Sequence, residues 1–407
     1  MREPIVITGC GPIAPNGIGV DTFWPNVVAG KSGISRIETI DTSALPNKFG
    51  GEVKDFRIED FDADERARDM GRGAQLSLAA ARLAMTDAGL SPRDLRDATT
   101  GIYIGTTMGE SPIAEGLRDH LEAGGTVAGY APRMRYHTVN MMSSMVAVHL
   151  GLTGPASVVP TACAAGNYAI GYACEALASG QCDYMLAGGV DPWSRIAYHG
   201  FNAMMAISPD VCRPFDRHRK GILISEGAGI VVLERESQAR RRGARIYAEL
   251  AGYGIAADGY HMTGPHPEGR GGILAGRRAM QRARIDPQDV DYVSAHGTGT
   301  PANDRIETHI ITTLLGSRAT TVPVSSIKSM LGHTMGAASA LETIVCARAI
   351  ETGVVPPTIN FETPDPECPL DVVPNQPREV RVRVAMNNSF AFGGNCATLL
   401  LRHYHGN

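Results

Sequence analysis

The sequence has no excess of charge of either sign and few aromatic residues. Its 407 residues carry 38 lysines and arginines against 42 aspartates and glutamates, for a net charge of -4, and aromatic residues make up only 6%. Non-specific nucleic-acid binding depends on a basic field, and single-strand binding depends on aromatic stacking platforms. We therefore expect no nucleic-acid partner.

Cysteine motifs and long apolar runs are also missing. The eight cysteines form no CxxC pair and no HExxH motif occurs, so neither a disulfide framework nor a metal site is predicted. No run of about 18 apolar residues is present, which predicts no membrane span. The N-terminal residues lead into a strand-like run without the apolar region of a signal peptide. We expect a cytoplasmic protein in a reducing compartment.

The sequence does contain an alternation of short apolar runs and longer Ala-rich stretches. Short runs bounded by Gly, Pro or Asn indicate strands, and the longer stretches indicate helices. The alternation is typical of the α/β class. The predicted strands span residues 4–8, 100–105, 156–161, 184–188, 229–234, 247–251, 291–295, 322–326 and 380–386, and the predicted helices span 73–88, 163–179, 272–283 and 336–352.

Two helical stretches, 164–178 and 336–349, consist mainly of Ala, Gly, Ser and Cys and carry few charges. Helices that are small on every face are typical of the space between packed layers, so we expect both to be buried and central. The arginine cluster at 239–245 is the best boundary within the chain. It predicts two similar halves, residues 1–250 and 251–407.

Cys163 follows a predicted strand and opens the first of these helices, in the segment PTACAAG (160–166). At a helix N-terminus a thiol meets the positive end of the macrodipole and unpaired N–H groups, which favours the thiolate and offers an oxyanion donor. The position therefore fits a nucleophile. A buried structural cysteine is the other interpretation.

Two histidines also follow predicted strands. His296 lies in the segment AHGTGTP (295–301), and His333 ends the segment SSIKSMLGH (325–333). Open α/β sheets bind ligands beyond the carboxyl ends of their strands, and glycines there allow close backbone approach. Each histidine fits a role in chemistry or a structural role in a turn.

Lys328 lies among apolar and small residues and needs an acidic partner, for which Glu342 is the obvious candidate. Such a pair either orients His333 or is purely structural. A fourth segment, NNSFAFGGNC (387–396), ends a further predicted strand in a flexible Gly-Gly loop or a simple hairpin. The cysteine and the two histidines meet only if the sheets bring their strand ends together.

With these segments in view, the chain resembles the β-ketoacyl synthases of the thiolase superfamily, which include the type II polyketide ketosynthases. The resemblance is closest to the elongating type that acts on acyl carrier proteins. It runs nearly end to end, through VITGCGPIAPNG, TACAAG, RPFDRHRKGILISEGAGIVVLE, AHGTGTPANDRIE, IKSMLGH and NNSFAFGG. It implies a five-layered αβαβα fold made of two similar βαβαβαββ halves.

The resemblance also implies residue roles. Cys163 would take the acyl chain as a thioester, while His296 and His333 would promote decarboxylation of a malonyl thioester and stabilise the enolate. Lys328 and Glu342 would support the two histidines. A thiolate exchanges acyl groups readily, and two imidazole N–H groups can hold the developing charge.

Further roles concern the substrate. The backbone N–H groups of Cys163 and Phe392 would form the oxyanion hole, and the Phe392 ring would act as a gate. Thr298 and Thr300 would hydrogen-bond the pantetheine arm, and Met108 and Phe390 would border the substrate. No cofactor is expected, because the substrates arrive on the phosphopantetheine of an acyl carrier protein.

Two kinds of partner follow from the resemblance. One is the carrier protein, which is usually acidic and would meet a basic patch, unless those residues form only a solvated charged face. The other is a second subunit joined through the sheet edge, as a homodimer or with a chain-length-factor-like chain. The candidate basic residues are Arg66, Arg68 and Arg72, and also Arg213, Arg217, Arg219 and Lys220.

Three departures from the family pattern stand out. Ala391 replaces the usual Gly before the gating Phe, Asn395-Cys396 replaces Thr-Asn, and Ser225 replaces a Gly. They favour specialised polyketide or unusual fatty-acid synthesis over housekeeping elongation. A non-catalytic chain-length partner would lack the nucleophile, and a thiol hydrolase would not need the second histidine.

Overall fold

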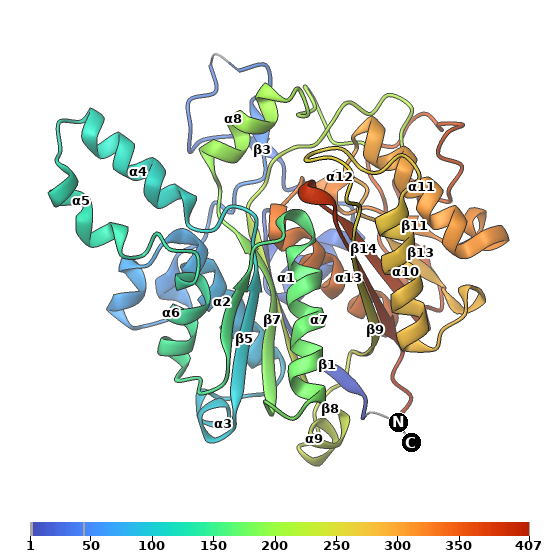
Figure 1. Ribbon diagram of the computed structural model, residues 1–407, viewed down its shortest axis with the longest axis horizontal. Helices are drawn as coiled ribbons and strands as arrows, with labels where there is room; N and C mark the ends of the chain where they lie inside the picture. The colour runs from blue at the N-terminus through green and yellow to red at the C-terminus, as the bar shows by residue number, and fades with distance from the viewer. Residues whose placement is uncertain (1–2, 44, 407) are drawn as a thin grey trace.

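The computed structural model of the chain describes residues 3–43 and 45–406 (Figure 1). Eleven of its strands form one continuous sheet, in which the short β2 (Gly17–Ile18) pairs only with β1 and the other ten form two sets of five. The first set is β1 (Ile5–Ala14), β5 (Thr100–Gly105), β6 (Ala156–Val159), β7 (Tyr184–Asp191) and β8 (Gly227–Arg235). The second set is β9 (Ala248–Ala257), β10 (Tyr292–Ser294), β11 (Val324–Ser325), β14 (Val384–Phe390) and β15 (Asn395–Arg402).

The two sets have the same topology. Across the sheet the order is β6-β5-β7-β8-β1 in one set and β11-β10-β14-β15-β9 in the other. Each set has two parallel pairings followed by two antiparallel ones. The sets meet where β1 pairs with β9. Two similar halves would produce this repeat, and the division at 250, which falls inside β9, stays a prediction.

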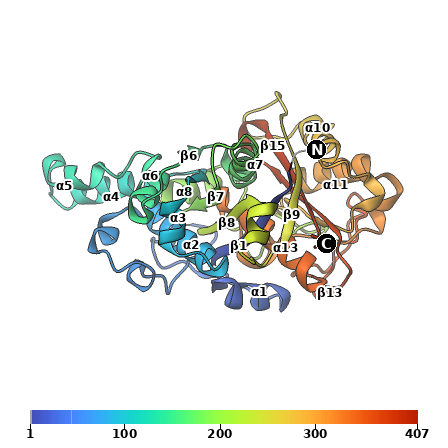
Figure 2. The same ribbon diagram turned by 90° about the horizontal axis from the view of Figure 1, so that it is seen from below.

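The helices complete a layered arrangement (Figures 1 and 2). α2 (Arg72–Asp87) packs on β1 and β8. α7 (Ala165–Ala178) and α13 (Ala338–Thr352) contact each other between the two sets of strands. α10 (Arg270–Ala283) covers β9 and β15, with α11 (Pro301–Leu315) beside it. Each set of strands therefore lies between an outer layer of helices and the shared central pair.

The close contact between the two central helices explains why their residues are small. A Cβ atom at Gly166 would lie 2.8 Å from the backbone nitrogen of Ala340, so the two helices touch backbone to backbone. The Asn167 N–H donates to Ser339 Oγ at 3.0 Å across the same contact. The prediction that these helices are buried and central is confirmed.

Other elements were predicted less well. The strand expected over 380–386 begins only at Val384, and α7 begins two residues late because Ala162–Ala164 form a 3-10 turn. The pair α4 (Ser111–Glu122) and α5 (Val127–Met134), which was not predicted, projects from the body in both views (Figures 1 and 2). Within residues 3–43 and 45–406, no helix has the length and apolarity needed to cross a membrane.

The remaining elements are short or connect the layers. The helices are α1 (Val20–Val28), α3 (Pro92–Asp97), α6 (Met141–Leu150), α8 (Arg195–Ala203), α9 (Glu236–Arg241) and α12 (Lys328–Leu331). The two-residue strands are β2 (Gly17–Ile18), β3 (Ser35–Arg36), β4 (Phe49–Gly50), β12 (Val354–Val355) and β13 (Arg378–Glu379).

Candidate active site

Cys163 lies in the turn between β6 and α7. The preceding residue, Ala162, has a φ of 52°, an uncommon conformation for a residue with a side chain and one that is often found at functional sites. Cys163 is only 6% exposed and lines a cavity of about 420 Å³. The sharp turn therefore presents the thiol to an enclosed space.

The protonation state of this thiol differs from the expectation. Burial raises the pKa of Cys163 to about 12, although the positive charge of Lys328 lowers it. Desolvation penalises the thiolate more than the nearby charge stabilises it. This shift towards the neutral thiol is opposite in direction to the one that the helix N-terminus alone predicts.

His296 follows β10 and lines the same cavity. Both oxygens of Glu307, on α11, accept backbone N–H groups at 2.7 Å, one from His296 and one from Gly297. The ring nitrogen Nδ1 of His296 has no hydrogen-bond partner among the described residues. Burial, together with the charge of Lys328 and the neighbouring His333, holds the pKa of His296 well below its usual value, so the ring is neutral.

His333 is the second imidazole of the cavity. Its ring centroid lies 5.5 Å from that of His296, at an interplanar angle of 81°. Nδ1 accepts the backbone N–H of Met335 at 3.1 Å, which assigns the ring proton to Nε2. Burial and the charge of Lys328 hold the pKa of His333 well below its usual value. The three predicted groups thus meet in one cavity, with both imidazoles neutral.

The predicted partnership of Lys328 and Glu342 is confirmed as a buried ion pair. Each residue is 1% exposed, and Lys328 Nζ donates to Glu342 Oε1. Burial raises the pKa of Glu342, while the charge of Lys328 opposes that shift. Since Lys328 lowers the pKa of both histidines and of Cys163, the pair acts on all three groups through its field.

Three predicted substrate residues, Thr298, Thr300 and Phe390, also line this cavity, and so does Phe392, the predicted oxyanion and gate residue. The hydroxyl oxygens of the two threonines lie 2.8 Å apart. The Phe392 ring stacks on Phe201 of α8, with centroids 5.4 Å apart. Sequence reasoning missed Phe201, because no motif surrounds it and only the fold brings α8 to this loop.

The departures in the last segment fit the backbone. Ala391 is extended, with φ -140° and ψ 159°, a conformation that any residue adopts. The next turn needs its glycines, since Gly393 and Gly394 have φ values of 78° and 76°. Cys396 is buried, and its Sγ donates to the Gly394 carbonyl at 3.5 Å. Replacing Gly by Ala391 therefore strains nothing in this conformation.

Other predicted residues lie elsewhere. Met108 does not line the cavity of Cys163 but a separate cavity of about 570 Å³, together with Glu110 and His137. Its predicted contact with substrate stays a prediction.

The first basic patch is largely neutralised by carboxylates. Ion pairs join Arg66 to Asp64, Arg68 to Glu59 and Arg72 to Glu226. Arg72 is also held over the Phe56 ring, 4.7 Å from its centroid. These arginines are therefore less available to an acidic partner than the sequence alone indicates.

The second group divides in two. Arg213 pairs with Asp210, and the buried Arg219 pairs with Asp365. Arg217 and Lys220 are exposed and have no ion-pair partner in the part of the chain that the structure describes. Lys220 precedes Gly221, whose N–H donates to the Gly299 carbonyl between the two cavity threonines. This places the Lys220 backbone close to the site.

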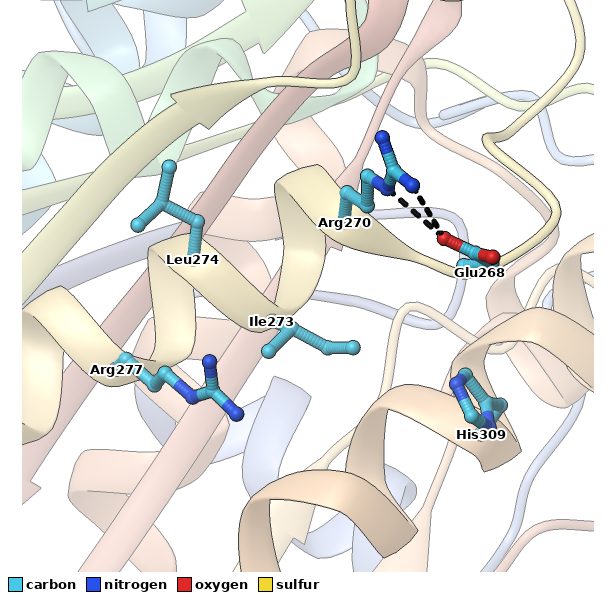
Figure 3. Close-up of a pocket in the computed structure, with 6 residues that line it drawn as sticks. All are labelled: Glu268, Arg270, Ile273, Leu274, Arg277 and His309. Carbon is cyan, nitrogen blue, oxygen red and sulfur yellow. Dashed lines mark hydrogen bonds and ion pairs between the residues drawn. The ribbon is translucent and has the colours of Figure 1, made fainter.

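A surface hollow of about 480 Å³ between α10 and α11 contains none of the predicted site residues. Figure 3 shows Arg270 turned toward Glu268, with Arg277 and His309 on either side of Ile273 in this view. The Arg270–Glu268 pair is mostly exposed. No cysteine lines the hollow, and it shares no lining residue with the cavity of Cys163.

A thiol and two neutral imidazoles in one cavity of a layered α/β fold define a thiolase-like condensing enzyme. Family models agree: residues 2–239 match "Beta-ketoacyl synthase, N-terminal domain" and residues 247–362 match "Beta-ketoacyl synthase, C-terminal domain". The chain belongs to the β-ketoacyl synthase family, whose members are acyltransferases.

Individual relatives are similar over their whole length. The chain is 40% identical to 3-oxoacyl-[acyl-carrier-protein] synthase 2 of Staphylococcus aureus, over 99% of both chains. It matches the structure of the ishigamide ketosynthase/chain length factor with a TM-score of 0.95 and 43% identity, over 100% of both chains. It also matches a chain in the structure of a type II PKS acyl-carrier protein in complex with its ketosynthase. That match has a TM-score of 0.89 and 33% identity, over 99% of this chain and 100% of that chain. The predicted thiolase-like fold is confirmed.

Proposed function

We propose that the protein extends an acyl chain held on Cys163 by decarboxylative Claisen condensation with a malonyl thioester. The observation that carries this proposal is the single cavity shared by Cys163, His296 and His333. A cysteine nucleophile that forms a thioester indicates acyl transfer. Two neutral N–H donors suit the stabilisation of an enolate oxygen better than they suit the hydrolysis of a thioester.

In the first half-reaction, the Cys163 sulfur attacks the carbonyl of an acyl thioester. The bond to the pantetheine sulfur breaks, and the thiol proton passes to that leaving sulfur. Because burial raises the pKa of Cys163 to about 12, a neutral imidazole of the cavity is needed as the relay base. The backbone N–H groups of Cys163 and Phe392 would bind the oxyanion.

In the second half-reaction, the malonyl group loses carbon dioxide, and the enolate oxygen is held by the N–H groups of His333 and His296. The enolate carbon attacks the acyl group on Cys163, the carbon–sulfur bond breaks, and the sulfur takes up a proton from solvent, because its original proton left with the pantetheine thiol. The product is a 3-oxoacyl thioester two carbons longer. Thr298 and Thr300 would hold the pantetheine arm, and no resident cofactor takes part in this scheme.

We further propose that the substrates are delivered to the protein on an acidic acyl carrier protein. The similar structures named above include a ketosynthase bound to its carrier protein, and a ketosynthase/chain length factor. The second subunit would pair along β6, whose residues Ala156 and Ser157 are exposed at the sheet edge, as a homodimer or with a chain-length-factor-like chain. No disulfide bond joins cysteines in the described part of the chain, which fits a cytoplasmic setting.

The pathway we favour is type II polyketide or specialised fatty-acid synthesis. Ala391, Asn395 and Cys396 support it as departures from the common pattern, and so does the 43% identity to the ishigamide enzyme. Housekeeping elongation is the second candidate, favoured by the 40% identity to 3-oxoacyl-[acyl-carrier-protein] synthase 2. A non-catalytic chain-length partner is disfavoured because Cys163 is present.

The test is to mix the purified protein with acyl-carrier and malonyl-carrier thioesters and weigh the products. We expect 3-oxoacyl-carrier from the wild type and none from Cys163→Ala, which also cannot become acylated. Free acid without a 3-oxoacyl product would indicate a hydrolase instead. Carriers from a polyketide and a fatty-acid system, compared at equal concentration, distinguish the two pathways.

A further inference from the structure

Asp191, the last residue of β7, is a fully buried carboxylate that the scheme above does not use. Its two oxygens accept four hydrogen bonds at 2.6 to 2.7 Å. Oδ1 accepts from Thr106 Oγ1 and the Met108 N–H, and Oδ2 accepts from the N–H groups of Thr107 and Gly336. A carboxylate held by so many donors fixes the segments that supply them.

Gly336 occupies a special place in the repeated fold. The 3-10 turn Met335–Ala337 opens α13, as Ala162–Ala164 opens α7, and the first residue of each turn has a positive φ, 54° and 52°. Gly336 therefore corresponds to Cys163. A Cβ atom at Gly336 would lie 2.7 Å from Asp191 Oδ2, so only glycine leaves room for the carboxylate.

The same turn reaches His333. The N–H of Met335, one residue before Gly336, donates to His333 Nδ1 at 3.1 Å. That bond keeps the ring proton on Nε2, the nitrogen that remains for the substrate. Anything that holds the turn in place thereby holds the tautomer of His333.

We propose that Asp191 is a positioning residue, which anchors the Met335–Gly336 turn so that His333 keeps its proton on Nε2. Through Oδ1 the same carboxylate holds the loop that carries Met108. The catalytic consequence rests on the proposed function, because only decarboxylation needs that N–H. The tautomer itself is a property of the resting protein and is tested independently.

The charge of Asp191 has an opposite effect on the thiol. Burial raises the pKa of Asp191 to about 6, so the group is ionised at neutral pH. Its negative charge raises the pKa of Cys163. Neutralising Asp191 should therefore leave the thiol equally or more reactive while it impairs His333, and general damage to the fold would not produce that split.

The test compares Asp191→Asn with Asp216→Asn in the full-length protein. Asn keeps one acceptor oxygen, and its NH2 group would face the donors of the other. Asp216 is a matched control, because it is also fully buried and accepts the N–H groups of His218, Glu362 and Thr363 at 2.7 Å. None of those three residues lines the cavity of Cys163.

For Asp191→Asn we expect malonyl decarboxylation to slow by about 10- to 100-fold through kcat. The alkylation rate of Cys163 by iodoacetamide should be unchanged or higher. In nitrogen-15 NMR spectra of protein with labelled histidine, His333 Nδ1 should no longer give the signal of an unprotonated nitrogen that accepts a hydrogen bond. Asp216→Asn should show none of these changes.

A wild-type rate in Asp191→Asn, an unchanged His333 tautomer, or an equal loss in the control would overturn the proposal. If Asp191→Asn does not fold, Gly336→Ala replaces it, because its Cβ displaces the carboxylate, and the same outcomes apply. If the wild type decarboxylates no malonyl thioester, the proposed function fails, while the NMR result still decides the role of Asp191.

Discussion

The buried pair of Lys328 and Glu342 allows a sharp test of how the site is held together. Both side chains are almost fully buried, and Glu342 Oε2, the oxygen that does not bond Lys328, has no hydrogen-bond partner among the described residues. In Glu342→Gln the ammonium group would lose its counter-charge. Breaking a buried pair in this way costs about 3–5 kcal/mol, so we expect the free energy of unfolding to fall by that amount.

The double variant Lys328→Met/Glu342→Leu separates charge from packing. Replacing both members of a buried pair by apolar residues is often neutral or stabilising by about 1–4 kcal/mol. We therefore expect the double variant to be more stable than Glu342→Gln alone. It should still lose condensation activity, because the field that acts on Cys163 and the histidines is gone.

The sign of the pH effect follows from that field. Lys328 lowers the pKa of His296 and His333, and burial lowers both further. Without the lysine charge both imidazoles bind protons at higher pH, so the acid limb of the pH–rate profile should move upward. In a Lys328→Met variant that retains activity, a shift of the acid limb to lower pH would contradict this reasoning.

Urea unfolding followed by circular dichroism measures the free energy of unfolding of each variant. The matched control is Asp97→Asn, which breaks an ion pair with Arg93 whose side chains are 84% and 68% exposed. That loss should stay below about 1 kcal/mol. If Glu342→Gln costs no more than this control, or if the double variant is no more stable than Glu342→Gln, the argument for the buried pair is refuted.

Three further predictions concern the cavity and its approach. Burial raises the pKa of Cys163 to about 12, so its alkylation rate in the free enzyme should rise about tenfold for each pH unit between pH 7 and 9. Peptide mass spectrometry measures the extent of alkylation. A plateau of the rate below pH 8 would contradict this expectation. Phe201→Ala removes one ring of an aromatic stack beside the cavity, so products should include longer or bulkier acyl chains, and an unchanged product profile would exclude this ring from chain selection. Charge reversal at Arg217 and Lys220 should weaken an acidic carrier and flatten its salt dependence, whereas reversal at the paired Arg66 should have a smaller effect; equal effects would refute the ranking.

Much of the fold could be predicted from local patterns. The strand over 100–105 was predicted with its observed bounds, because a β-branched and apolar run lies between turn residues. The strand predicted over 380–386 began too early for a physical reason. Val380 and Val382 alternate like strand residues, but Val380 bonds the Gly353 carbonyl in an irregular connection, and β14 begins only at Val384. Periodicity reports burial of side chains and does not report which backbone groups pair.

In the site, too, some residues could be predicted from local sequence and others could not. Cys163 and His296 could be predicted because each follows a strand at a turn with a special backbone, and such turns leave a local trace in sequence. His333 instead follows the short helix α12 and Gly332, whose φ is 71°, so the expectation that it comes directly after a strand was wrong. Phe201 and Asp191 leave no such trace, since each acts through a contact with a distant segment. The pKa shift of Cys163 differs in direction from the sequence expectation for a related reason: the helix terminus is local, whereas desolvation is imposed by everything that encloses the cavity. The groups that perform the chemistry can therefore be predicted from motifs, while the groups that set their protonation depend on the complete fold.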